Sequence, residues 1–286
     1  MLYQFVKILS KIVCIMPRYA RVTLGNLVGE VCWLIIPQNR KNIAINNVRT
    51  CLDLEANHAY RLAKLSSTRF GRMFMEILAF PDIKKDVNKH VRIQGKEHLE
   101  EALSYGQGVV LATAHSGNWE LLGGALALNG FPMVGVAKKQ SNQQMDKFIN
   151  EYRTLTGMHI TYKTGVREMV RMLGEGKIIG LLMDQTAGNQ SSLSEFFNRP
   201  TRIPQGPAAL ARMKNAPIVV AFITENQDGT HTIYLNKPIW IEATQNRNHD
   251  VEIMTQHLAQ TIEKHIRSYP HEWFWLHNLW KNRPDK

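Results

Sequence analysis

The chain has 286 residues, 44% of them hydrophobic, so it is long enough to bury a sizeable core in one large domain or two modest ones. Its 35 Lys and Arg residues outnumber its 24 Asp and Glu residues, which gives a net charge of +11. This composition excludes a disordered chain and favours an acidic partner, such as nucleic acid, an anionic membrane surface or a phosphorylated substrate. A generally basic surface would give the same balance.

The first 36 residues are rich in apolar side chains. Lys7 and Lys11 interrupt the first apolar run, which argues against a cleavable signal sequence. The run predicts an amphipathic helix that either lies in a membrane interface or packs on its own domain. Its apolar face would consist of Leu2, Phe5, Val6, Leu9, Ile12, Val13 and Met16.

A second apolar run lies between Arg21 and Arg40. Its 18 residues include one charge, Glu30, which places it at the lower edge of the length that spans a bilayer. We therefore expect residues 1–36 to be membrane-associating helices and residues 37–286 to form a single α/β domain. The three cysteines, at positions 14, 32 and 51, have no metal-binding spacing and predict reduced thiols in a cytosolic redox environment.

Proline and hydrophobic periodicity divide the chain into elements. Residues 1–80 are predicted to be helical, with breaks at Pro17 and Pro37, a short basic helix at 40–51 and a longer helix at 56–80. From residue 91 strands alternate with helices, which predicts an α/β fold with a mostly parallel or mixed central sheet flanked by helices. The expected strands are 91–93, 109–113, 133–137, 159–162, 178–183 and 218–223, with late edge strands at 231–235 and 238–241. The expected helices are 97–104, 120–129, 143–156, 165–173, 206–213 and 249–269.

The stretch between strand 109–113 and helix 120–129 reads His115-Ser-Gly-Asn-Trp-Glu120. A strand that hands over to a helix marks the carboxyl edge of an open α/β sheet, where ligands bind. On a continuous helix His115 and Glu120 would lie about 140° apart, so we expect the Ser-Gly-Asn turn to bring them together. The alternative is structural: Asn118 would cap the helix and Glu120 would offset its dipole.

Other polar groups are expected at the same edge of the sheet. Lys138 follows strand 133–137, and Asp184 follows strand 178–183, where it would serve equally well as a loop cap. The aromatic C-terminal tail, residues 269–281, is expected to form an interfacial aromatic belt, to close over a lipid-filled groove, or to cover the core. No G-x-S-x-G elbow, Walker loop or H-E-x-x-H motif is present, and we expect no nucleic-acid partner because the aromatic residues gather in the tail.

With these residues assembled, the chain resembles the bacterial lipid A biosynthesis acyltransferases, the lauroyl and myristoyl transferases within the wider glycerophosphate and lysophospholipid acyltransferase superfamily. The resemblance covers nearly the whole chain, and its most specific part is the H-x4-E signature from His115 to Glu120. The remaining matches are Arg40-Lys41 with Asn46-Asn47, Glu76, the block Lys138, Asn142, Asp146 and Arg153, the block Asp184-Gln185 with Phe196-Phe197 and Pro204-x-Gly206, and the tail Trp273-x-Trp275-x-His277 with Trp280-Lys281.

The resemblance implies a transfer of a fatty acyl chain from an acyl carrier protein or CoA thioester to a lipid hydroxyl, at the cytoplasmic face of the inner membrane. It implies His115 and Glu120 as the catalytic pair. The expected substrate-binding residues are Lys138, Asn118, Asp184, Arg153 and His277. The acceptor would be a lipid A precursor, and the alternatives are another lipid acceptor, such as a lysophospholipid or glycolipid, or a lipid-binding protein without turnover.

Acyl transfer to a hydroxyl needs a base for the hydroxyl proton and stabilisation of a tetrahedral oxyanion. We expect His115 to be that base and Glu120 to fix its tautomer. No Ser or Cys is placed to be acylated, so transfer is predicted to be direct, with no metal or organic cofactor. The oxyanion is expected to be stabilised by Lys138 or by backbone N–H groups near Gly117 and Asn118.

Overall fold

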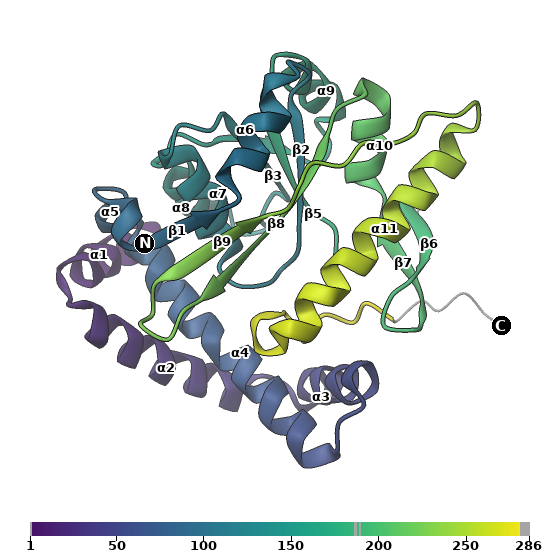
Figure 1. Ribbon diagram of the computed structural model, residues 1–286. Helices are drawn as coiled ribbons and strands as arrows, with labels where there is room; N and C mark the ends of the chain where they lie inside the picture. The colour runs from purple at the N-terminus through teal and green to yellow at the C-terminus, as the bar shows by residue number, and fades with distance from the viewer. Residues whose placement is uncertain (1, 186–187, 189, 281–286) are drawn as a thin grey trace.

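The computed structural model describes residues 2–185, 188 and 190–280 and is built on a seven-stranded sheet (Figure 1). The strands are β1 (Val91–Gln94), β2 (Val109–Thr113), β3 (Met133–Ala137), β4 (His159–Tyr162), β5 (Ile178–Leu182), β8 (Ile218–Glu225) and β9 (His231–Leu235), in the spatial order β1-β9-β8-β2-β5-β3-β4. Strands β8, β2, β5, β3 and β4 are parallel. Strand β9 runs antiparallel to β8, and β1 runs parallel to β9. The sheet is therefore mixed, with a parallel majority.

Helices cover both faces of this sheet. Alternate residues of β2 point to opposite sides, so Val109 and Leu111 belong to one hydrophobic core while Val110 and Ala112 belong to the other. The first core includes α6 (Lys96–Ser104), α7 (Trp119–Leu128) and α8 (Gln143–Thr154). The second includes α9 (Val166–Gly174), α10 (Gly206–Lys214) and α11 (Arg247–Ser268). This three-layer arrangement is the fold class that the alternation of elements predicted.

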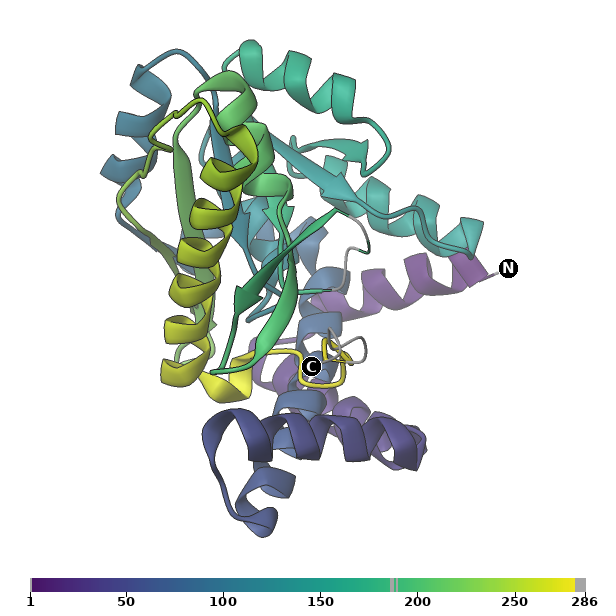
Figure 2. The same ribbon diagram turned by 90° about the vertical axis from the view of Figure 1, so that its right-hand side faces the viewer.

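The N-terminal helices lie beneath one edge of the sheet (Figures 1 and 2). They are α1 (Leu2–Ile15), α2 (Arg18–Ile35), α3 (Gln38–Leu52), α4 (Ala56–Leu78) and the single turn α5 (Phe80–Ile83), followed by the 3-10 turn η1 (Val87–Lys89). Helix α2 lies directly on α4 because both helices have glycine residues where they cross. A Cβ added at Gly29 would lie 1.9 Å from the carbonyl oxygen of Thr68, and one at Gly71 would lie 2.1 Å from that of Gly25.

Helix α1 has one face packed on the protein and one face exposed. Val6 and Val13 are buried, and Lys7 pairs with Glu151 of α8 at 2.7 Å. The exposed apolar residues of this helix are Leu2, Phe5, Ile8, Ile12 and Ile15. The predicted apolar face is thus divided between the interior and the surface.

The structure differs from the strand predictions in three ways: one pair of strands was missed, and two predictions were wrong. A two-stranded hairpin, β6 (Ser191–Glu195) and β7 (Pro200–Pro204), was not predicted because its alternating serine and charged residues lack a strand-like apolar pattern. Strand β9 is not at an edge, since it lies between β8 and β1. Residues 238–241 form only an isolated bridge, between Ile239 and Ile218.

Within the described residues, no single helix has both the length and the apolar character of a membrane span. Helices α2 and α3 meet that test only as a pair, and the chain bends by 108° between them.

The crossing of α2 and α4 predicts a large effect of a single methyl group. Gly71→Ala should lower the free energy of unfolding by about 1–3 kcal/mol, because the added Cβ would meet backbone atoms that cannot move aside. Gly174→Ala is the matched control, since its Cβ would be no closer than 3.5 Å to the flexible end of Lys214. Urea unfolding of both variants measures the difference, and equal stability would show that the helices do not cross this closely.

Candidate active site

The register of two neighbouring strands places His115 beside Asp184. Strands β2 and β5 are parallel neighbours, and Thr113 is paired with Leu182. Two residues further along each strand, His115 and Asp184 leave the same edge of the sheet side by side. This is the carboxyl edge at which the sequence predicted a site, and it holds the predicted histidine.

Asp184 holds His115 at two points. One carboxylate oxygen, Oδ1, lies 2.7 Å from ring Nδ1 of His115, and the other, Oδ2, accepts the backbone N–H of His115 at 2.7 Å. The indole N–H of Trp273 also donates to Oδ2, at 2.7 Å. The ring of Trp119 meets the imidazole edge to face, with the ring centres 4.9 Å apart. The imidazole is therefore fixed on its Nδ1 side.

The Asp184 carboxylate is charged although it is buried. Burial alone would raise its pKa, but the electrostatic attraction of the His115 ring and the hydrogen bonds from His115 and Trp273 outweigh burial and lower the pKa below its usual value. The His115 side chain is 19% exposed, whereas that of Asp184 is 2% exposed. A buried anion thus stands behind a histidine whose Nε2 remains on the accessible side.

The expected pairing of His115 with Glu120 was wrong. Glu120 lies in the first turn of α7 and forms a two-pronged ion pair with Arg153 of α8, at 2.8 and 2.6 Å. Burial alone would lower the pKa of Arg153, and the bond to Glu120 raises it instead. The Ser-Gly-Asn turn does not fold Glu120 back to the histidine, because the helix begins at Trp119 and directs Glu120 toward α8.

The turn itself is fixed by Gly117 and Asn118. Gly117 has a φ of +65°, and a Cβ there would lie 1.9 Å from the carbonyl oxygen of Ile223. We had expected the Gly117 N–H to stabilise the oxyanion. It instead donates to the carbonyl of Glu272 at 3.0 Å and is therefore not available. The Asn118 side chain caps α7 by accepting the N–H of Leu121 at 3.0 Å.

Asn118 is also held from behind by helix α4. Its amide donates to Glu76 at 2.6 Å, and the other carboxylate oxygen of Glu76 lies 3.4 Å from His231. We had predicted that Asn118 contacts substrate. Its side chain is fully buried, so it positions the turn instead. Glu76, which the resemblance to a family singled out, therefore has a structural partner in the His115–Glu120 segment.

The aromatic tail pairs with the turn like a short extra strand. Ser116 forms a bridge with Trp273, and the N–H of Phe274 donates to the carbonyl of His115 at 3.0 Å. Trp273, Trp275 and Trp280 are at most 7% exposed. The tail therefore covers the core, and the alternative of an interfacial aromatic belt is wrong for these three residues.

A buried layer of charged residues anchors the tail. Arg69 of α4 forms an ion pair with Glu272, directly before Trp273, and lies 3.7 Å from Glu225 at the end of β8. Arg72 pairs with Glu225 at 2.9 Å. Breaking such a pair would leave a buried charge without compensation, which is costly. The layer therefore fixes the position of Trp273 against Asp184.

The remaining predicted residues lie at different distances from this centre. His277 is half-buried, and burial lowers its pKa. Asn47 donates to the His277 carbonyl at 3.0 Å. Lys138 is exposed beyond the end of β3. Lys281 lies outside the described residues.

An apolar cavity lies beside this site, between α7 and strands β2, β3 and β5. Trp119, Glu120 and Arg153 belong to its wall, and its apolar wall includes Leu111, Met133 and Met158. The cavity exists partly because glycines line it: a Cβ at Gly123 would lie 3.0 Å from the sulfur of Met158. It has the chemistry of a slot for an alkyl chain.

Within the described part of the chain, no cluster of three or more His, Cys, Asp or Glu side chains could hold a metal ion, and all three cysteines are free thiols.

Comparison with known proteins shows what the chain is similar to. The model of a family described as bacterial lipid A biosynthesis acyltransferase matches residues 1–282. A phosphatidylinositol mannoside acyltransferase of Mycolicibacterium smegmatis is 27% identical over 225 residues, which cover 77% of this chain and 72% of that protein. The lipid A biosynthesis palmitoleoyltransferase of Escherichia coli is 22% identical over 270 residues, which cover 91% and 85%. The crystal structure of the 1-acyl-sn-glycerophosphate acyltransferase PlsC from Thermotoga maritima matches 90% of this chain and 100% of that one, at 12% identity and a TM-score of 0.42.

Proposed function

Because the chain belongs to the bacterial lipid A biosynthesis acyltransferase family and is therefore an acyltransferase, we propose that it moves a fatty acyl chain from a thioester to a hydroxyl group of a lipid A precursor. The thioester is that of acyl carrier protein or of CoA, and the reaction takes place at the cytoplasmic face of the inner membrane. The observation that supports this most strongly is a histidine held by a buried carboxylate beside an apolar slot.

The chemistry follows from the tautomer of His115. Its Nδ1 proton is donated to Asp184, so Nε2 has a free lone pair that can accept the proton of the acceptor hydroxyl. The hydroxyl oxygen then bonds to the thioester carbon, and the resulting tetrahedral intermediate expels the thiolate as the C–S bond breaks. The proton on Nε2 passes to this thiolate, and Asp184 stabilises the imidazolium between the two steps.

Glu120 and Arg153 have a different role in this mechanism. Their ion pair belongs to the wall of the apolar cavity and joins α7 to α8. It fixes the width of the slot in which the acyl chain lies, so that the thioester carbon reaches His115. Glu120 thus acts as a positioning residue, and His115 is the group that touches the reacting atoms.

Two acceptor classes are compatible with the relatives. The Escherichia coli relative is named for lipid A, and the mycolicibacterial relative is named for phosphatidylinositol mannoside. The second relative has the higher identity, over a shorter stretch, so a hydroxyl of another glycolipid is the second candidate acceptor. Both candidates need the same base and the same slot.

The experiment that tests the function is a panel of acceptors offered with both donors, with products identified by mass spectrometry. We expect a new ester on a glycolipid acceptor and no product with His115→Ala. Asp184→Asn should lower kcat at least 100-fold, as expected for loss of an effective general base, because its amide can present an N–H to Nδ1 and favour the wrong tautomer.

Glu120→Gln is the matched control in the same experiment, because it also replaces a carboxylate by an amide at this site. It should raise KM for the donor more than it lowers kcat. Lipid binding without any product for every donor and acceptor pair would contradict the enzyme assignment and leave a lipid-binding protein. A large loss in Glu120→Gln with normal turnover in Asp184→Asn would return the role of partner to Glu120.

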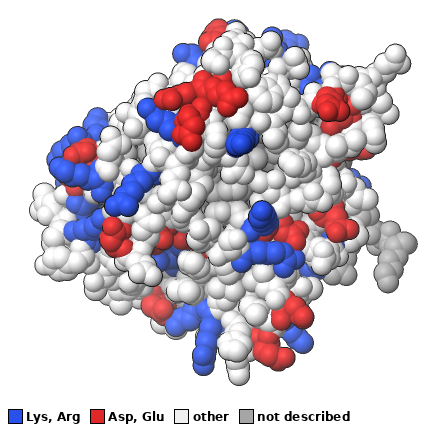
Figure 3. Space-filling view, in the orientation of Figure 1, with Lys and Arg blue, Asp and Glu red and all other residues white. Residues whose placement is uncertain are grey.

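Membrane association is proposed for the exposed side of α1 and α2. Of the 18 exposed large hydrophobic residues in the part of the chain that the structure describes, ten lie on these two helices, and Ile15 and Leu34 are 84% and 75% exposed. Figure 3 shows Lys and Arg side chains gathered on the side of the molecule where α1, α2 and α5 lie in Figure 1. Exposed apolar residues beside cationic ones suit an anionic bilayer surface. Residues 1–36 would then be the membrane-associating part of the chain.

Substitutions test this better than deletion of residues 1–36, because α2 packs on α4 and its removal would expose the core. The double variant Ile15→Asp with Leu34→Asp should bind vesicles of phosphatidylcholine and phosphatidylglycerol at least tenfold more weakly, since two buried side chains contribute about 1.5–3 kcal/mol each. Ile253→Asp is the control, because Ile253 is exposed on the outer side of α11. This variant should bind the vesicles as the unmodified protein does. Flotation assays measure the binding, and unchanged flotation of the double variant would contradict the proposal.

A further inference from the structure

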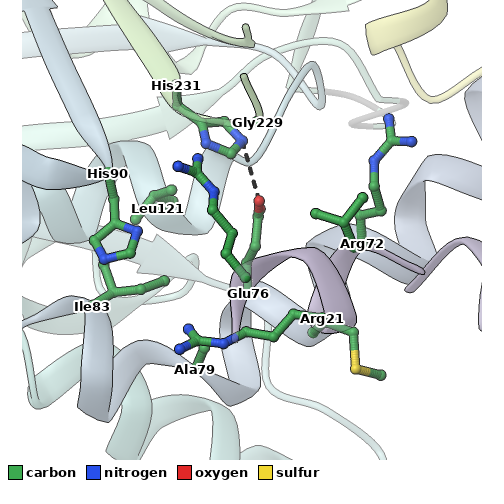
Figure 4. Close-up of a pocket in the computed structure, with 12 residues that line it drawn as sticks. Arg21, Arg72, Glu76, Ala79, Ile83, His90, Leu121, Gly229 and His231 are labelled. Atoms are coloured by element: carbon green, nitrogen blue, oxygen red, sulfur yellow. Dashed lines mark ion pairs between the residues drawn. The ribbon is translucent and has the colours of Figure 1, made fainter. Parts of the chain in front are cut away.

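A second cavity lies next to the helix that follows the His115 turn, because Leu121 of α7 belongs to its lining. Residues of α2, α4, α5 and β9 also line it, together with His90 directly after η1 (Figure 4). Its polar lining consists of Arg18, Arg21, Arg72, His90, His231 and Glu76. Figure 4 shows His90, His231 and Glu76 around the same space. The cavity shares Arg18, Arg72 and Gly229 with a wider surface cleft, which gives it a route to the outside.

The three arginines of this cavity differ in their partners. Arg21 pairs with Asp82 at 2.5 Å, and Arg72 pairs with Glu225 at 2.9 Å. Arg18 has no carboxylate within 4 Å among the residues that the structure describes, although it is half-buried. A guanidinium that has lost part of its water without gaining an anion is a binding group that awaits one.

Arg18 lines both the cavity and the outer cleft, beside Gly229. Its guanidinium lies within 3.5–3.7 Å of the place where a Gly229 side chain would begin. Burial and then the charge of Arg18 lower the pKa of His90, and burial lowers that of His231 to about 4, with Arg18 acting in the same direction. Both imidazoles are therefore neutral near pH 7. His231 directs its Nε2 to Glu76, so His90 is the imidazole that can offer its N–H beside the guanidinium.

The acidic groups around Arg18 already have donors. Glu76 is the one carboxylate among the residues that line the inner cavity; Asn118 and His231 occupy its oxygens, and burial raises its pKa. In the outer cleft, Asp228 accepts from the N–H and hydroxyl of Thr230, at 2.8 and 2.5 Å. The positive charge of Arg18 is therefore not cancelled by a bonded carboxylate.

We propose that this cavity binds a phosphomonoester group, with Arg18 and His90 as the donors. The two-pronged guanidinium of Arg18 and the one N–H of His90 match the three terminal oxygens of a phosphomonoester. The favoured source is the headgroup of a membrane lipid, because Tyr19, 76% exposed, lies in the wall of the outer cleft and belongs to the helix whose outer side is proposed to meet the bilayer. A soluble phosphomonoester has the same chemistry. The site goes beyond acyl transfer and does not depend on it.

The test compares vesicles of phosphatidylcholine that contain phosphatidic acid with vesicles that contain phosphatidylglycerol at matched surface charge. Arg18→Ala should bind the phosphatidic acid vesicles at least tenfold more weakly, as expected for loss of a charge-assisted hydrogen-bonding group, and should bind phosphatidylglycerol vesicles unchanged. Arg18→Lys should lie between the two, because it keeps the charge and loses the fork. Arg61→Ala, on the exposed side of α4, changes charge equally and should have no selective effect.

Calorimetry with glycerol 3-phosphate tests the soluble source. Binding that needs Arg18 supports the site even if the vesicles show no preference, and then assigns it to a soluble phosphomonoester. The proposal is overturned if neither probe depends on Arg18, or if Arg61→Ala weakens phosphatidic acid binding as much as Arg18→Ala does. His115→Ala should keep this binding while losing acyl transfer, so the two proposals fail separately. The thermal midpoint of each variant shows whether it is folded.

Discussion

The contact between His115 and Asp184 is the constraint on which the rest of the site depends. One buried carboxylate accepts both the ring N–H and the backbone N–H of the histidine. The imidazole therefore cannot rotate without breaking its hydrogen bond to Asp184, which follows the neighbouring strand. The contact exists because β2 and β5 are parallel neighbours in register. Every other group described at the site either supports this pair or shapes the space in front of it.

Support comes from distant parts of the chain. The tail reaches the turn through Trp273, whose indole donates to Asp184, and the tail is itself anchored by the ion pair of Arg69 with Glu272. Helix α4 contributes twice, through Arg69 and through the Glu76 carboxylate that holds Asn118. Helix α4 therefore connects α2, whose outer side is proposed to meet the membrane, with the turn that carries the proposed base. Both the apolar slot and the arginine-lined cavity have wall residues on α7, the helix that follows this turn.

The sequence predicted the parts of this arrangement that depend on local pattern. Short apolar runs located the seven strands of the central sheet, and the strand-to-helix passage placed His115 at their carboxyl edge, with Asp184 at the same edge. The partner of His115 was assigned wrongly because strand order is not a local property: Asp184 is 69 residues away, and only the adjacency of β2 and β5 brings it to the imidazole. Glu120 was the nearer carboxylate in sequence, yet α7 directs it to Arg153. The division of the apolar face of α1 between interior and surface was missed for the same reason. It depends on contacts with distant segments, such as the pairing of Lys7 with Glu151 of α8.

The most direct test of the account is the protonation of the His115 ring, measured by nitrogen NMR on protein with ¹⁵N-labelled histidine and assigned with His115→Gln. For the neutral imidazole the account predicts a proton on Nδ1 and a bare Nε2, and the same pattern in Glu120→Gln. A proton on Nε2 in the wild-type protein, or a change of tautomer in Glu120→Gln, would contradict the claim that Asp184 prepares this histidine to act as a base.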